Sequence, residues 1–292
     1  MSIFPPSRAT ASRRRAPSRE EAIVYAVLDD MRHTLRMGWV DLAISSVSSQ
    51  PVFFTAAWAA TRPNVTRSFA SGAEQIRAVS LDAVREELDT IDALRPDPAV
   101  EPVDLERLRR TIQAIHCIAP RVLLVIQAWA IMSRRQRLPG TGLEEPPAKR
   151  GVPGWQEGIL SLPRSVPSES EALLDEATVA LNVAFTPPAL QAVAPSPHRL
   201  ERVWRGLSAA ARTPEWNQAI MSIRRVAATV LRSLPHPMDL QWDVLPRRGL
   251  TEDRRRALAE HLAAMAASMP VSVLAASALA DAYGVAEAPG DW

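Results

Sequence analysis

The sequence is poor in several residue types, and their scarcity excludes particular kinds of protein. A single cysteine, Cys117, rules out an internal disulfide and a cluster of metal-binding thiolates. Glycines number 11, and no glycine-rich phosphate-binding loop occurs among them. The 5 histidines lack the spacing of a metal site, and no HExxH pattern is present. We therefore expect neither a metal nor a cofactor.

Lysine is almost absent as well. Lys149 is the only lysine among 34 basic residues, and five arginines fall in residues 1–19, where there is no acid. Without those five charges the formal net charge of +2 becomes −3 for residues 20–292. We expect residues 1–18 to form a disordered arginine-rich tail. A net acidic body without interleaved aromatic and basic residues argues against nucleic acid as a partner.

Long apolar runs are also missing. The longest run extends from Val122 to Met132, about half of the roughly 20 residues that a membrane-spanning helix needs. The tail has no apolar stretch of the kind found in secretory signals. These features predict a cytoplasmic protein that does not contact a membrane.

The residues that are abundant favour helices. Apolar residues make up 47% of the chain, which is enough for a substantial core, and they recur at spacings of three and four. Aromatic residues make up only 5% of the chain, and alanine and leucine predominate. The predicted fold class is all-α.

An internal repeat is the most informative feature. At an offset of 146 positions, landmarks in the two halves of the chain coincide: Asp29 with Asp175, Leu35 with Leu181, Trp39 with Phe185, Pro51 with Pro197, and Trp58 with Trp204. We predict two homologous multi-helix repeats that form a pseudo-twofold dimer with a cleft between them. The expected boundaries are 19–138 and 169–285, with a Pro/Gly-rich linker at 139–168 and a short tail at 286–292.

Helix borders can be read from local signals. Ser18 with Glu21, and Ser168 with Glu171, have the spacing of a capping box, so each pair predicts a helix start. Later in the first repeat we expect separate helices at about 65–79, 81–94, 104–118 and 120–135.

The runs DDMRHTLRMGWVDLAI, PVFFTAAWAATRPN and IHCIAPRVLLV resemble the group I 2-haloacid dehalogenases, also called halocarboxylic acid dehydrogenase-like proteins. The resemblance extends over both repeats. It implies an all-helical pseudo-dimer with an active site between the repeats, where water attacks the halogen-bearing carbon of a 2-haloacid directly. An aspartate of the second repeat would activate the water, an asparagine before a proline would help to hold it, and a tryptophan would line the halide pocket.

Carried onto this chain, the resemblance places these roles on residues that only partly suit them. The tryptophan matches Trp39, whose indole N–H can bind a departing anion. The asparagine position falls on Ala119, and the aspartate position falls on or beside Pro188 and Ala189, in the stretch FTPPAL that follows Val183 and Ala184. Neither alanine nor proline can accept a proton. The sequence therefore predicts a divergent member that lacks the group needed to activate water.

Other residues near these positions are candidates for the site. Asp41 and His116 are the predicted catalytic residues, although a helix cap and a packed neutral histidine are the ordinary roles of such residues. Arg36 is a candidate for binding a substrate carboxylate, and Leu42 and Phe185 complete the predicted pocket. The predicted ligand is a small anionic or carboxylate-bearing substrate. The basic run at Arg254, Arg255 and Arg256 is either a solvated helix face, which is the usual role of such a run, or a docking site for an acidic carrier protein that delivers the substrate.

Three functions remain open at this stage. The first is an enzyme that expels halide or sulfate from a saturated carbon through attack by an amine within the substrate, which closes a small nitrogen ring in natural-product biosynthesis. The second is a non-catalytic subunit of a hetero-oligomer with a catalytic partner, and the third is an ordinary hydrolytic 2-haloacid dehalogenase. A homodimer is compatible with the first and the third.

Overall fold

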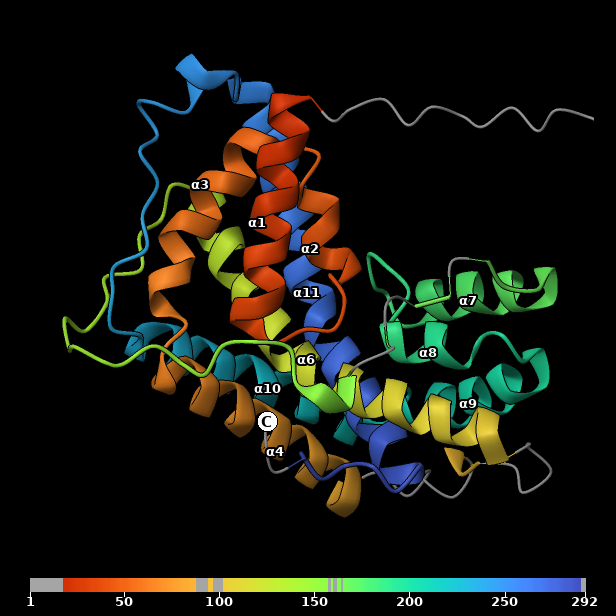
Figure 1. Ribbon diagram of the computed structural model, residues 1–292. Helices are drawn as coiled ribbons and strands as arrows, with labels where there is room; N and C mark the ends of the chain where they lie inside the picture. Colours follow the sequence, from red (N-terminus) through yellow and green to blue (C-terminus); the bar gives the residue numbers. More distant parts are fainter. Residues whose placement is uncertain are drawn as a thin grey trace, which may run out of the picture.

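The computed structural model describes residues 18–87, 94–96, 102–156, 159, 162–163 and 165–289, and these residues fold into α-helices joined by loops and three short 3-10 turns. Figure 1 shows the arrangement. The helices are α1 (Arg19–Leu35), α2 (Leu42–Val47), α3 (Pro51–Thr61), α4 (Arg67–Glu87), α6 (Pro102–Ser133), α7 (Ser168–Ala180), α8 (Pro188–Val193), α9 (Pro197–Ala210), α10 (Pro214–Ser233) and α11 (Glu252–Ala282). The described part of the chain contains isolated β-bridges but no strand. The all-α fold class is confirmed.

The helices recur along the chain at the spacing of the sequence repeat. Helices α2 and α8 start at Leu42 and Pro188, and α3 and α9 start at Pro51 and Pro197, so both pairs are separated by the same 146 positions. The offset is larger for the later pairs, α4 with α10 and α6 with α11. This spacing supports the division into repeats 19–138 and 169–285, which stays a prediction.

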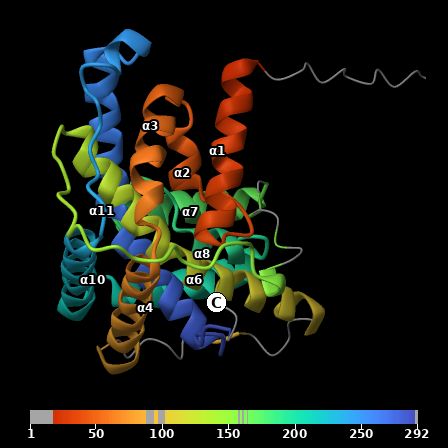
Figure 2. The same ribbon diagram turned by 60° about the vertical axis from the view of Figure 1, so that its left-hand side comes forward.

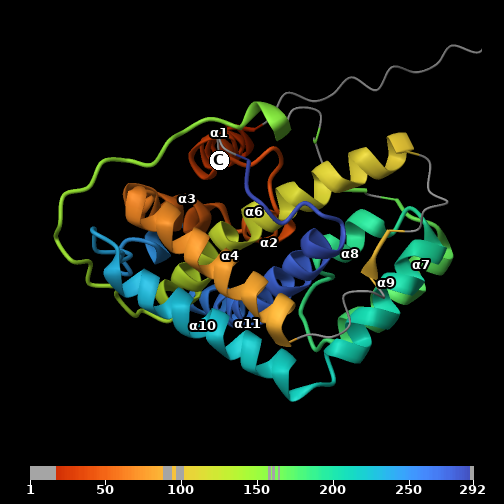
Figure 3. The same ribbon diagram turned by 90° about the horizontal axis from the view of Figure 1, so that it is seen from below.

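The centre of the molecule is built from corresponding helices of the two halves. Helix α11 packs along α6, and α10 packs along α4, as Figure 3 shows for the underside of the molecule. Figure 2 shows α1, α2 and α3 gathered beside this central group, whereas α7, α8 and α9 form a second group in Figures 1 and 3. Helices α2 and α8 both contact α6, so the two groups approach each other across the central helices.

The two central helices are long and apolar enough to cross a membrane by length and composition alone. However, 89% of the apolar window in Asp104–Ser133 and 78% of that in Glu252–Ala282 is buried inside the protein. Helices covered by protein in this way form the core of the fold. The burial removes the need for a lipid environment around them.

Two predicted breaks in the first repeat are wrong. Helix α4 is continuous from Arg67 to Glu87, and α6 runs through Pro120 without ending. Helix α11 likewise contains Pro270 in its interior. A proline removes one backbone hydrogen bond, but in these buried helices the packing on all sides maintains the helical path. Residues 88–93 of the expected helix at 81–94 lie outside the described part of the chain.

The two predicted capping boxes have different outcomes. Ser18 and Glu21 form the reciprocal pair, with the Ser18 backbone N–H donating to Glu21 Oε2 at 2.6 Å. At the start of α7 the prediction is wrong, because Pro167 is the N-cap and Ser168 already belongs to the helix. The extended conformation that proline adopts there places the helix start one residue earlier than the serine signal suggests.

The linker at 139–168 crosses the surface and is attached to both halves. The Thr141 backbone N–H donates to the Leu234 carbonyl and the Gly142 backbone N–H donates to the Pro235 carbonyl, both at 2.9 Å. Further along, Glu145 accepts hydrogen bonds from the backbone and hydroxyl of Ser68 at the start of α4. In Figure 3 the green trace of this segment passes around one side of the molecule to the end of α1.

Candidate functional site

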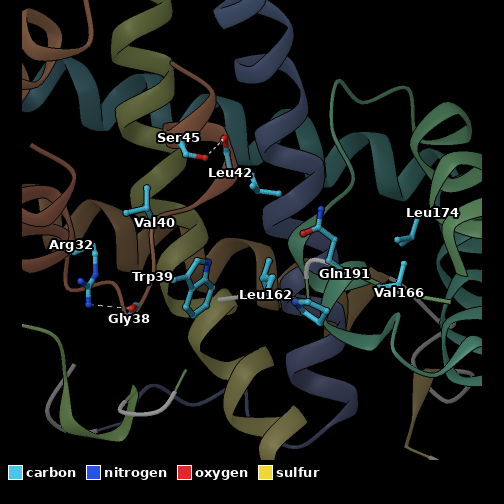
Figure 4. Close-up of a pocket in the computed structure, with 11 residues that line it drawn as sticks. Arg32, Gly38, Trp39, Val40, Leu42, Ser45, Leu162, Val166, Leu174 and Gln191 are labelled. Atoms are coloured by element: carbon cyan, nitrogen blue, oxygen red, sulfur yellow. Dashed lines mark hydrogen bonds between the residues drawn. The ribbon is translucent and has the colours of Figure 1, made fainter. Parts of the chain in front are cut away.

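A cavity of about 800 Å³ lies between the two groups of helices. One wall comes from the end of α1, the loop that follows it and α2, and the opposite wall comes from the linker, α7 and α8 (Figure 4). The residues that line it are Arg32, Gly38, Trp39, Val40, Leu42, Ser45, Leu162, Pro163, Val166, Leu174 and Gln191. Most of these side chains are apolar, and a few polar groups are placed among them, as is usual in pockets for organic ligands.

The polar side chains of the cavity are one cation, Arg32, and the neutral groups of Trp39, Ser45 and Gln191. Arg32 lies at the edge, where its Nη1 is 3.5 Å from Asp29 Oδ1 and its Nη2 donates to the Gly38 carbonyl at 3.4 Å. Its side chain is 35% exposed, so it can still contact an anion. Trp39 places its indole between the Arg32 side and Leu162 (Figure 4). Among the described lining residues there is no aspartate, glutamate or histidine.

The loop that carries Trp39 is fixed by the linker. Gln156, which is buried, accepts a hydrogen bond from the Gly38 backbone N–H at 2.6 Å and donates to the Arg36 carbonyl at 3.2 Å. Gly38 has to be small here, because a Cβ atom would lie 3.0 Å from the Ile159 carbonyl oxygen. The linker therefore holds one wall of the cavity in place through a single amide side chain.

Asp41 is the carboxylate nearest to this wall in sequence, and it caps α2. Its Oδ1 accepts a hydrogen bond from the Ala43 backbone N–H at 2.8 Å, which is the geometry of an N-cap. Burial raises the pKa of Asp41 to about 6, although the Ala43 hydrogen bond opposes this shift. Its neighbours Val40 and Leu42 line the cavity, but Asp41 itself does not.

His116 belongs to a different part of the core. Its Nε2 lies 3.3 Å from Arg77 Nη1 and its Nδ1 lies 3.3 Å from Ser277 Oγ, in a buried group between α4, α6 and α11. Burial, reinforced by the Arg77 charge, lowers the pKa of His116 to about 3. The imidazole is therefore neutral at physiological pH, and it packs in the core between Arg77 and Ser277. It is not among the residues that line the cavity.

Of the remaining predicted site residues, Trp39 and Leu42 line the cavity. Arg36 does not, because it points to a second, smaller cavity on the other side of its loop. Ala119, Pro188 and Ala189 are buried in the core, and Phe185 packs against the core from a half-buried position. The structure thus brings two of the predicted pocket residues together and places the others behind the walls.

Sequence reasoning missed Arg32, Ser45, Gln156 and Gln191. Arg32 lies four positions before the predicted Arg36, and Ser45 lies three positions after the predicted Leu42 in α2, so helical spacing from these two residues offered a signal for them. Gln191 follows the double proline by one turn in the same way. Gln156 lies in a linker without periodicity, and nothing in its local sequence points to the contact with Gly38.

Two further predictions concern other parts of the surface. Within the basic run at the start of α11, Arg255 pairs with Glu252, which also binds Arg135 at 2.8 Å. This pairing neutralises part of the run, and docking of an acidic carrier stays a prediction. Among the residues that the structure describes, no group of three His, Cys, Asp or Glu is placed to hold a metal ion.

Known proteins resemble this chain in sequence and in structure. No protein-family model matches it. A configuration-inverting 2-haloacid dehalogenase from Pseudomonas sp. (strain 113) is 24% identical over 234 residues, which cover 77% of this chain and 76% of that protein. A mutant of D-2-haloacid dehalogenase in complex with D-2-CPA superimposes with a TM-score of 0.78 at 18% identity, covering 91% of this chain and 93% of the other. A complex of D-2-haloacid dehalogenase with L-LA has a TM-score of 0.77 at 18% identity over the same shares of the two chains.

These comparisons confirm the predicted resemblance. The protein is haloacid dehalogenase-like in sequence, and its fold is that of the 2-haloacid dehalogenases.

Proposed function

We propose that the protein displaces an anionic leaving group, halide or sulfate, from a saturated carbon, and that an amine within the substrate is the nucleophile. The observation that carries this proposal is the composition of the main cavity. Its described lining offers an indole N–H, a hydroxyl, an amide and a guanidinium, but no carboxylate and no imidazole. Such a site can stabilise a departing anion but cannot deprotonate water.

Displacement at saturated carbon requires a nucleophile and a stabilised leaving group. An amine on the carbon next to the leaving group is already a good nucleophile when it is neutral, so it needs orientation more than it needs a base. Its lone pair forms the new carbon–nitrogen bond while the bond to the leaving group breaks, and that pair of electrons departs with the halide or sulfate. The ring nitrogen then releases a proton to solvent at the open side of the cavity.

The chain's own residues would divide this task. Trp39 Nε1–H would donate to the departing anion, and Arg32 would bind a carboxylate of the substrate at the cavity edge. The apolar walls, which include Leu162, Val166 and Leu174, would exclude water from the reacting carbon.

The hydrolytic alternative rests on Asp41. A carboxylate with a pKa of about 6 is suited to act as a general base near neutral pH. To do so it would have to leave the Ala43 backbone N–H and turn into the cavity between Val40 and Leu42. The second alternative is a non-catalytic subunit. It rests on the same observation as the main proposal, the lack of acid–base groups in the described lining of the cavity. It also requires a catalytic partner protein.

One assay on the purified chain separates these functions. Leaving-group release is measured with 2-chloropropionate and with 3-amino-2-chloropropionate, which carries an internal nucleophile. Our proposal predicts chloride release from the amino compound only, well above the rate without enzyme. Release from both would favour the hydrolase, and release from neither would favour the non-catalytic subunit.

A further inference from the structure

A distal cavity adjoins the main cavity at the linker. It has a volume of about 620 Å³ and lies between the start of α6, the end of α8 and the start of α9. Leu162 and Pro163 of the linker line both cavities, so the two spaces share a wall. Figure 4 shows Leu162 beside Trp39 in the main cavity. An elongated ligand that passes these two linker residues would occupy both spaces.

The charged side chains of the distal cavity are two cations and one acid. Arg107 on α6 and Arg199 on α9 are the cations, and Asp104 is the acid. Within the described part of the chain, neither arginine forms a salt bridge with a carboxylate. Thr111 Oγ1 donates to the Arg107 carbonyl at 3.0 Å, and Ser196 Oγ accepts from the Arg199 backbone N–H at 3.4 Å, so both hydroxyls serve their own helices. The two guanidinium groups remain as the donors for a ligand.

The equivalent place in the other half of the molecule is closed. The offset of 146 positions pairs Ala192 with Ser46, and the 150 positions between the internal prolines of α6 and α11 pair Thr111 with His261. Ser46 Oγ lies 2.9 Å from His261 Nε2, so a hydrogen bond joins α2 to α11 there. Their counterparts Ala192 and Thr111 line the distal cavity instead. The cavity is therefore a difference between the two halves and not a general property of the repeat.

We propose that the distal cavity binds a carboxylate at the far end of an elongated substrate. The substrate would be a dicarboxylate that carries its amine and its leaving group near one end. This proposal rests on the proposed function, because the reacting end remains in the main cavity near Trp39 and Arg32. The far carboxylate would accept hydrogen bonds from Arg107 and Arg199, whose planar guanidinium groups match its two oxygens.

The charge of the distal cavity selects a carboxylate over a more highly charged group. Two arginines and Asp104 give its described lining a net charge of +1. A carboxylate brings one negative charge, which this lining balances. A phosphate dianion would leave one negative charge in excess and would be repelled by Asp104.

Binding of unreactive acids tests this proposal without turnover. Straight-chain dicarboxylates from glutarate to sebacate, and the monocarboxylates of the same lengths, are titrated into the full chain by isothermal titration calorimetry. At one length we expect the dicarboxylate to bind about tenfold more tightly than its monocarboxylate, because it gains a second charge-assisted contact. Equal affinities at every length would overturn the proposal. None of these acids carries a leaving group, so the result is independent of whether the protein releases chloride.

Two double variants locate the second contact. Arg107→Met with Arg199→Met removes both cations, and the matched control, Arg205→Met with Arg212→Met, removes two exposed arginines that bond to Glu201 and to the Ser208 carbonyl. The first should lose the tenfold advantage of the dicarboxylate and keep the affinity for the monocarboxylate, whereas the control should keep both. An advantage that survives the loss of both cations would place the second carboxylate elsewhere and contradict the assignment.

The other double variant, Thr111→His with Ala192→Ser, fills the distal cavity with the pair that the other half already accommodates. It should also lose the advantage of the dicarboxylate, and an undiminished advantage would count against the proposal. Crystals of the wild type soaked with the tightest dicarboxylate show the contacts directly. We expect one carboxylate at Arg32 and the other between Arg107 and Arg199. A far carboxylate that points into solvent would overturn the proposal.

Discussion

The indole Nε1 of Trp58 donates a hydrogen bond to Asp30 Oδ2 at 2.8 Å, which ties α3 to α1. In the second half of the chain, the Nε1 of Trp204 donates to Glu176 Oε1 at 2.9 Å and ties α9 to α7 in the same way. Each tryptophan lies 28 positions after its carboxylate. The same tertiary contact is thus made twice by equivalent helices.

This relationship predicts that the two tryptophans contribute similar stability. Trp58→Phe and Trp204→Phe keep an aromatic ring in the core and remove the donor together with the pyrrole part of the indole. We expect each to lower the free energy of unfolding by about 1–3 kcal/mol, the range for a hydrogen bond to a charged group. Urea denaturation measures the effect, and the double variant should show nearly additive losses. A large loss in one variant and none in the other would contradict the equivalence of the two contacts.

Asp41 predicts a characteristic pH dependence of stability. Its pKa in the folded protein is about 6 and therefore lies above the ordinary value of 3.8, so the folded state binds its proton more tightly than the unfolded state does. The stability that this proton provides is complete below pH 3.8 and is lost as the pH rises through about 6. Asp41→Asn keeps the cap and removes the titration. The free energy of unfolding of Asp41→Asn, relative to that of the wild type, should therefore rise by about 2–3 kcal/mol as the pH is raised from 4 to 7.5.

The control for this experiment is Thr213→Asn, which exchanges the N-cap of α10 for another capping residue and changes no titratable group. The stability difference between it and the wild type should stay nearly constant with pH. If the difference for Asp41→Asn is equally constant, Asp41 is not buried as an acid of raised pKa.

Gln156 predicts a link between the linker and the wall of the main cavity. Gln156→Met keeps the length of the side chain but removes both of its hydrogen bonds. The Gly38 backbone N–H loses its acceptor, and the Arg36 carbonyl loses its donor. We expect a loss of about 1–3 kcal/mol of stability, because two buried backbone groups lose their partner. Hydrogen exchange should accelerate at the amides of residues 37–40 and not in α4. Unchanged exchange in that loop would show that the linker does not position it.

If the indole N–H of Trp39 stabilises the leaving group, its removal should slow the reaction. Trp39→Phe removes the indole N–H and keeps an aromatic wall, so the rate of leaving-group release should fall by about 10²-fold. Trp242→Phe is the matched control, because Trp242 is half-buried, does not line the main cavity, and lies between Arg135 and Arg255, whose guanidinium carbons are 5.8 and 5.9 Å from its ring. The control should keep full activity. Equal rates in Trp39→Phe and the wild type would exclude the indole as the anion donor.

The sequence carried enough information to predict the fold class, because apolar periodicity and the shared landmarks at one offset extend over most of the chain. It also predicted Trp39 and Leu42 as part of a pocket. It could not predict that Pro120 lies inside a continuous helix, since whether a proline ends a helix depends on the packing around it. The hydrogen bond of Gln156 to the Arg36 carbonyl and that of Arg121 to the Leu35 carbonyl join residues 120 and 86 positions apart. Such contacts depend on the tertiary path of the linker and leave no local pattern.

The central claim is that the main cavity expels an anion without activating water. The most direct test is the reaction of 3-amino-2-chloropropionate with the purified protein in water enriched in ¹⁸O, followed by mass spectrometry of the product. The account predicts a cyclic amino acid that has lost chloride and contains no solvent oxygen at the former halogen-bearing carbon. A hydroxylated product that carries one ¹⁸O at that carbon would contradict it and would assign the base to a carboxylate such as Asp41.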